Sequence, residues 1–158
     1  MSPIPTHRGG RRGTLIIPNL HDVLVLVDAL TPDQRTIGHW SLGQICKHLA
    51  DSIHGSIDGF DLRRHRIKRF FFARSLLWFT YRYGIPAGYT VDPKLAPPGD
   101  IGLDEAIGEL RDAIQRYQRH AGPLHAHPLF GRLSRPAWDR LHCFHCAHHL
   151  SFVLPGNA

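Results

Sequence analysis

Two histidines near the C-terminal end, His145 and His149, are spaced to hold a metal ion together. They are four residues apart in a strongly helical pattern, so their rings share one helix face, one turn apart. Two imidazoles at this spacing can chelate one ion without bending the helix. Further ligands must come from another element, and the best candidate is His48, in the helical segment Ile45-Cys-Lys-His-Leu-Ala50.

Other histidines keep a structural interpretation open. The chain has 13 histidines, and most need only a surface position or a hydrogen-bond partner in the core. On spacing alone, a metal site and satisfied structural histidines are equally open. His142 shares the face of His145 and His149, so it is a candidate fourth ligand or a partner of a ligand. His148 points about 100 degrees away from His149 on an ideal helix and is left out.

The sequence offers no clear general base beside these histidines. Asp51 follows His48 by three residues and could approach the same face, as a partner of a ligand histidine or as a solvated helix carboxylate. Cys143 and Cys146 have redox or zinc spacing, but they fall inside a helical pattern and no second cysteine pair accompanies them. With Cys46 they make three cysteines, which cannot all pair, so we expect a reducing, cytoplasmic location.

The elements that must position these residues are helices. Apolar residues recur at spacings of three and four, and good N-caps (Asn19, Ser41 and Ser134) precede three of the segments. The predicted helices cover residues 21–30, 42–58, about 62–83, 104–121 and 135 to about 153. The prediction is an all-α fold, a four-helix bundle plus one shorter helix, with a long proline-rich connection at residues 84–100 between the middle helices. Residues 1–13 are expected to form a flexible basic tail, and residues 14–158 one domain.

Charge and hydropathy limit the classes of binding partner that the sequence predicts. The net charge is +6, and many arginines lie between residues 62 and 82. A solvated basic face is the simpler interpretation, since no helix-turn-helix, finger or aromatic-basic signature accompanies them, so nucleic acid is an unlikely partner. The most apolar run, residues 70–79, contains Arg74 and is too short to span a bilayer, so no membrane role is expected. The aromatic segment 70–83 makes a homodimer possible.

Two motifs resemble a known superfamily. The stretch Gly38-His-Trp-Ser-Leu-Gly-Gln-Ile45, the following His48-Leu-Ala50, and His145-x-x-x-His149 resemble the DinB-like superfamily of metalloenzymes. That superfamily is a four-helix bundle with a metal held by three histidines, one from the second helix and two from the last. The resemblance therefore implies His48, His145 and His149 as metal ligands.

A second set of residues narrows the resemblance to one branch of that superfamily, whose function is unassigned. It comprises the loop His127-Pro-Leu-Phe-Gly131, Ser134, Trp138 and His148-His-Leu-Ser-Phe152. The likeness covers about residues 14–155 and is least specific over residues 61–100.

The resemblance also implies a range of chemistry. Characterised relatives include metal-dependent transferases and isomerases that use low-molecular-weight thiols. Three histidines leave coordination positions for water or substrate, as in catalytic sites. The expected function is that of a protein holding one divalent ion, zinc or nickel, as a thiol-dependent transferase or a hydrolase on a small substrate. The alternative is a non-enzymatic stress-response or interaction module that the metal only stabilises.

Overall fold

The computed structural model describes residues 15–60, 66–84, 96–97, 99 and 101–154, and only the backbone of residues 66–74. The described residues contain five α-helices and no β-strand, which confirms the all-α prediction. The helices are α1 (Leu20–Asp28), α2 (Leu42–Asp58), α3 (Arg66–Tyr83), α4 (Leu103–Arg119) and α5 (Arg135–Leu150). The expected tail, residues 1–13, and most of the 84–100 connection lie outside the described residues.

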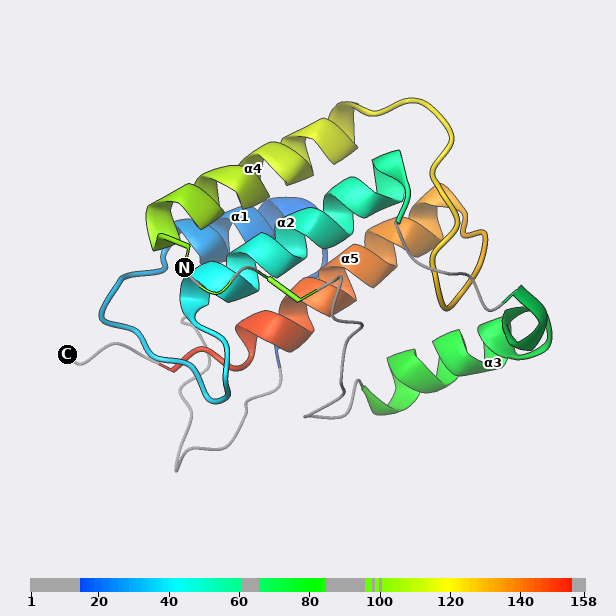
Figure 1. The fold of residues 1–158 in the computed structure, drawn as a ribbon, viewed down its shortest axis with the longest axis horizontal. Coiled ribbons are helices and arrows are strands. Elements are labelled where there is room, and N and C mark those ends of the chain that lie inside the picture. The colour runs from blue at the N-terminus through cyan, green and yellow to red at the C-terminus, as the bar shows by residue number, and fades with distance from the viewer. Residues whose placement is uncertain (1–14, 61–65, 85–95, 98, 100, 155–158) are drawn as a thin grey trace.

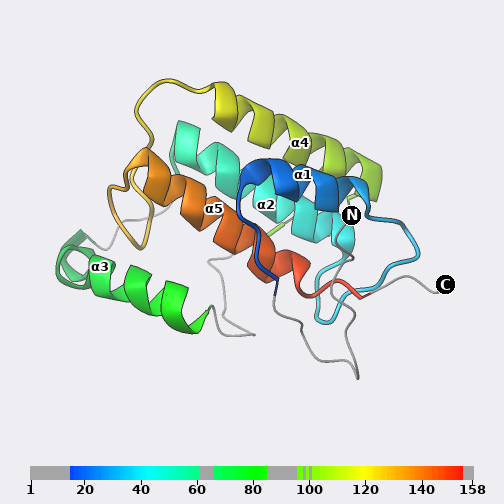
Figure 2. The same ribbon diagram turned by 180° about the vertical axis from the view of Figure 1, so that it is seen from behind.

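Helices α1, α2, α4 and α5 pack around a common core (Figures 1 and 2). The most extensive contact joins α2 to α4, and smaller contacts join α2 to α5 and α1 to both α4 and α5. Helix α3 lies beside α5, away from the other three. It reaches α5 through Tyr81, whose ring meets Phe144 edge-on with centroids 5.5 Å apart. No helix in the described part of the chain is long and apolar enough to cross a membrane.

The beginning and end of α2 follow from local side-chain chemistry. Ser41 Oγ accepts a hydrogen bond from the backbone N–H of Gln44, and Gln44 Oε1 accepts one from the N–H of Ser41. This reciprocal pair is a capping box, which satisfies two N–H groups that the first turn leaves unpaired. The helix ends at Gly59, whose φ of +94° is a conformation that side chains other than glycine rarely adopt.

Helix α5 ends earlier than the sequence predicts. Its N-cap is Ser134, as predicted, but its last residue is Leu150 and not one near Val153. The reason is a competing set of backbone hydrogen bonds. The N–H of Ile37 donates to the carbonyl of Phe152, and the N–H of Leu154 donates to the carbonyl of Arg35. These bonds connect the segment after α5 to the loop before α2.

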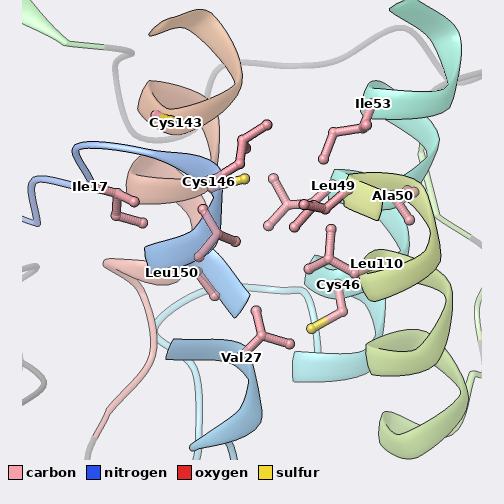
Figure 3. Close-up of a cluster of buried hydrophobic side chains, with 14 of the residues drawn as sticks. Ile17, Val27, Cys46, Leu49, Ala50, Ile53, Leu110, Cys143, Cys146 and Leu150 are labelled. Atoms are coloured by element: carbon pink, nitrogen blue, oxygen red, sulfur yellow. The ribbon is translucent and has the colours of Figure 1, made fainter. Parts of the chain in front are cut away.

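The core is apolar and includes all three cysteines (Figure 3). Burial raises the pKa of Cys46 to about 12 and that of Cys143 to about 11, and it also raises the pKa of Cys146. A neutral buried thiol behaves as a small apolar side chain and is a poor nucleophile. The C-x-x-C spacing therefore reflects packing.

The core predicts the effect of one substitution. Leu110 on α4 is fully buried, so Leu110→Ala should lower the free energy of unfolding by about 2–5 kcal/mol through lost transfer energy and a residual cavity. Urea denaturation monitored by circular dichroism measures this loss. The control is Val25→Ala on α1, where the side chain is 57% exposed and the loss should be much smaller. Equal losses in the two variants would contradict this assignment of the core.

Candidate metal centre

The structure brings His48, His145 and His149 together, as the sequence predicts. His48 comes from α2, and the other two come from successive turns of α5. The Nε2 atom of His145 lies 3.2 Å from Nε2 of His48 and 3.0 Å from Nε2 of His149. One ring nitrogen from each histidine lies within 4.8 Å of the others, so the three could hold one metal ion.

The nitrogen separations match those around a first-row metal ion. Metal–imidazole bonds are about 2.0–2.1 Å long, so two nitrogens on one ion are about 3.4 Å apart in tetrahedral geometry and about 3.0 Å apart at octahedral right angles. The distances of 3.2 and 3.0 Å lie in or at the edge of this range. Both separations from His145 Nε2 therefore suit the ligation of one ion.

The local electrostatics keep the His145 ring in the form that binds metals. The pKa of His145 lies well below its usual value, because burial disfavours the imidazolium and because His149 and His48 are close enough to repel it. A neutral imidazole retains a lone pair, which is the form that binds metals. The Nε2 atom of His145 faces two other ring nitrogens but carries only one proton or one lone pair. Without an ion, Nε2 of His145 can therefore form a full hydrogen bond with only one of these two nitrogens at a time.

Aromatic neighbours hold these rings in place. The ring of Trp40 stacks on His149 with centroids 5.5 Å apart and an interplanar angle of 14°, and it also touches His48 at 4.9 Å. On another side of His149, the ring of His148 makes an edge contact at 4.8 Å. In the sequence, Trp40 stands out only as part of a motif, which does not reveal this contact. Its place directly before the N-cap of α2, the helix that carries His48, was the available signal.

His142 lies in a different cluster, outside the group of three. Its side chain is buried, and its Nε2 lies 3.2 Å from Ser56 Oγ. The Ser56 hydroxyl donates to the carbonyl of Ile53, so its oxygen accepts the Nε2 proton of His142. Trp138 stacks on the His142 ring at 5.0 Å, and Tyr117 meets its edge at 4.8 Å. The structure therefore gives His142 a place in the core and does not bring it to the three-histidine group as a ligand.

Asp51 also lies elsewhere. Its carboxylate pairs with Lys47 Nζ at 2.7 Å, and its side chain is 45% exposed. Lys47 reaches Glu109 on α4 as well, at 2.8 Å. The carboxylate thus belongs to a surface ion pair on α2, which corresponds to the solvated alternative that the sequence left open.

Loop residue His127 has a structural role. Its Nδ1 accepts hydrogen bonds from the backbone N–H groups of Leu129 and Phe130, at 3.1 and 3.2 Å. Its ring also stacks on Phe130 with centroids 4.5 Å apart. These contacts fix the turn from His127 to Gly131 that precedes α5.

The burial of His142 predicts a pH dependence of stability. Desolvation, followed by the nearby His127 and Arg135, lowers its pKa from 6.5 to about 3. Between these two values the unfolded chain binds a proton that the folded chain rejects. Stability is therefore complete above pH 6.5 and falls with decreasing pH, by about 1.4 kcal/mol per pH unit for one such group.

Urea denaturation of chelator-treated protein between pH 7 and pH 4 measures this slope. His142→Gln removes the titrating group and should make the slope shallower by about one proton, while His145 still contributes. Val25→Ala, at an exposed position of α1 without a titratable group, should leave the slope unchanged. Identical slopes in wild type and His142→Gln would refute the assignment.

Comparison with known proteins places the chain in a family. No curated protein and no solved structure matches it significantly. A family model described as "Protein of unknown function (DUF1569)" matches residues 10–156, which is nearly all of the 158 residues. The chain therefore belongs to the DUF1569 family.

Proposed function

We propose that this protein binds one divalent metal ion through the Nε2 atoms of His48, His145 and His149, in a four-helix bundle of the DinB-like type. The observation that carries the proposal is the convergence of three ring nitrogens from two helices. His48 and His145 are 97 residues apart in sequence, yet their Nε2 atoms are 3.2 Å apart. Helix periodicity explains the contact of His145 with His149, but it does not explain the contact of His48 with His145.

The donor set favours an ion that accepts imidazole and keeps an open position. In the described residues, the group that could hold an ion contains three histidines and no carboxylate or cysteine. Three neutral ligands leave the full charge of a divalent ion uncompensated, so an anionic fourth ligand such as hydroxide or a thiolate is favoured. Zinc and nickel both suit such a site, and we propose one of these two.

We further propose a transferase that uses a low-molecular-weight thiol, or a hydrolase, acting on a small substrate. When bound, the ion would lower the pKa of a water or thiol and polarise a substrate oxygen. The part played by the chain is to orient the three imidazoles, with Trp40 stacked on His149 and touching His48. The incoming thiol would come from solution, because Cys46 and Cys146 are buried in the core with raised pKa values. We place this activity in the cytoplasm, where free cysteines such as these persist.

The second candidate is a metal-stabilised module without enzymatic activity. It is favoured by the positions of Asp51 and His142, since neither lies where it could act as an acid or base at the ion. Asp51 is paired with Lys47 at the surface, and His142 is buried against Ser56. In this case the ion would only strengthen the junction of α2 with α5.

Metal content tests the site itself. Untagged wild-type protein, reconstituted with zinc or nickel and desalted, should retain about one equivalent by elemental analysis. His149→Ala should lose it, because two histidines alone bind far more weakly. His21→Ala is the matched control and should retain the ion. If wild type holds no metal after reconstitution, or if His149→Ala holds as much as wild type, the proposed function is wrong.

A cobalt-substituted protein tests the thiol-dependent transferase against the purely structural ion. Glutathione added to the Co²⁺ form should produce a sulfur-to-cobalt charge-transfer absorption if a coordination position is open to an external thiol. His149→Ala treated in the same way is the control for cobalt bound elsewhere. A spectrum that glutathione leaves unchanged would exclude the thiol-dependent transferase and support the purely structural ion.

A further inference from the structure

The side of α5 that faces away from His145 lines a groove of about 940 Å³. Cys143 and Ala147 lie in its wall, and each is two residues from His145, which is about 200 degrees around an ideal helix. The groove is lined on its other sides by residues 15–20, which lead into α1, and by Tyr81 of α3. It is therefore separate from the candidate metal centre, and its volume is near the upper end of the roughly 300–1,000 Å³ typical of small-molecule sites.

Most of the groove wall is apolar. Ile17 and Leu20 line it from one side, and Cys143, Phe144 and Ala147 line it from α5. Beside them, the side chain of Ile16 is 81% exposed and adds apolar surface at the edge of the groove. These side chains suit the hydrocarbon part of a ligand.

One arginine of the groove is already fully engaged. Arg135 donates to the backbone carbonyls of His120 and Tyr117 at 2.7 and 2.6 Å, and it pairs with Asp139. Its guanidinium also lies over the ring of Tyr117, 4.1 Å from the centroid. Asp139 in turn accepts a hydrogen bond from the Tyr117 hydroxyl at 2.7 Å. These groups form a closed network that stabilises the end of α4.

Arg140 is the cation of the groove that remains available. Its guanidinium lies over the ring of Tyr81, 4.2 Å from the centroid, which leaves its N–H groups free to donate. Within the described part of the chain, Arg140 makes no ion pair and no hydrogen bond. A guanidinium in this state matches one carboxylate in charge and in bidentate geometry. The nearby carboxylate of Asp139, in the same wall, disfavours a ligand with two negative charges.

We propose that this groove binds an amphiphilic monocarboxylate, a molecule with one carboxylate and an apolar chain. The carboxylate pairs with Arg140, and the chain lies against the apolar wall formed by α5 and residues 15–20. This site does not depend on the proposed metal function, because none of its residues belongs to the three-histidine group.

Calorimetric titration with decanoate tests the proposal on the 158-residue protein as purified. Wild type should bind one equivalent. Arg140→Gln, a change at an exposed position that should not affect folding, should weaken binding about tenfold or more. Arg132→Gln is the matched control, because Arg132 is exposed and lies outside the groove. Decanol, which lacks the charge, should bind wild type and Arg140→Gln equally.

A second variant tests the apolar wall. Ala147→Leu adds volume to the wall and should weaken both decanoate and decanol, with circular dichroism confirming that the variant is folded. The proposal is overturned if wild type does not bind decanoate, or if Arg140→Gln binds it as tightly as wild type. It is also overturned if Arg132→Gln weakens binding as much as Arg140→Gln, because the fatty acid would then be following the net positive charge of the protein.

Discussion

The burial of α2 against α4 and α5 is the packing constraint on which the rest of the structure depends. Only a small residue fits on α2 where a neighbouring backbone or ring comes closest to it. Gly43 shows the limit, since a Cβ atom there would lie 2.5 Å from the carbonyl oxygen of Ile101, at the entry to α4. Gly55 shows it at the other end, where a Cβ atom would meet the ring of Phe60. These small residues let the neighbouring segments approach α2, and His48 faces α5 between them.

The same packing makes three adjacent histidines tolerable in the folded protein. Imidazolium ions at these separations would repel one another in a medium of low polarity. Burial keeps His145 neutral, and the stacked ring of Trp40 covers part of His149 and His48. The remaining cost of placing these polar rings between helices is that three ring nitrogens compete for too few hydrogen bonds. That arrangement is poor as a structural device, whereas it suits a cation.

Local chemistry made much of this fold predictable. Asn19, Ser41 and Ser134 act as N-caps in the structure, because a side-chain oxygen three residues before a free backbone N–H is a local signal. The pairing of His145 with His149 is equally local. His48 could be placed only by helix order and by a resemblance, since its contact with α5 spans most of the chain.

The features that the sequence did not reveal depend on contacts between distant segments. Helix α5 ends at Leu150 because residues 152–154 bond to residues 35–37, a choice that no local pattern encodes. Asp51 pairs with Lys47, which Glu109 of α4 also contacts, so Asp51 is engaged away from the histidines, although helical spacing alone permitted either outcome. The groove beside Arg140 required residues 15–20, α3 and α5 to be placed in space.

The 97-residue separation of His48 and His145 has a consequence for kinetics. Contacts between distant residues carry a large loop-closure cost, so the ion-binding nitrogens meet only when α2 and α5 have docked. Of these three ligands, the unfolded chain brings at most the pair on α5 close together. A ligand that requires the docked state stabilises the native protein more than the transition state whenever docking is late. An ion held by all three histidines would then act as a clasp, lengthening the lifetime of the folded protein without accelerating its formation.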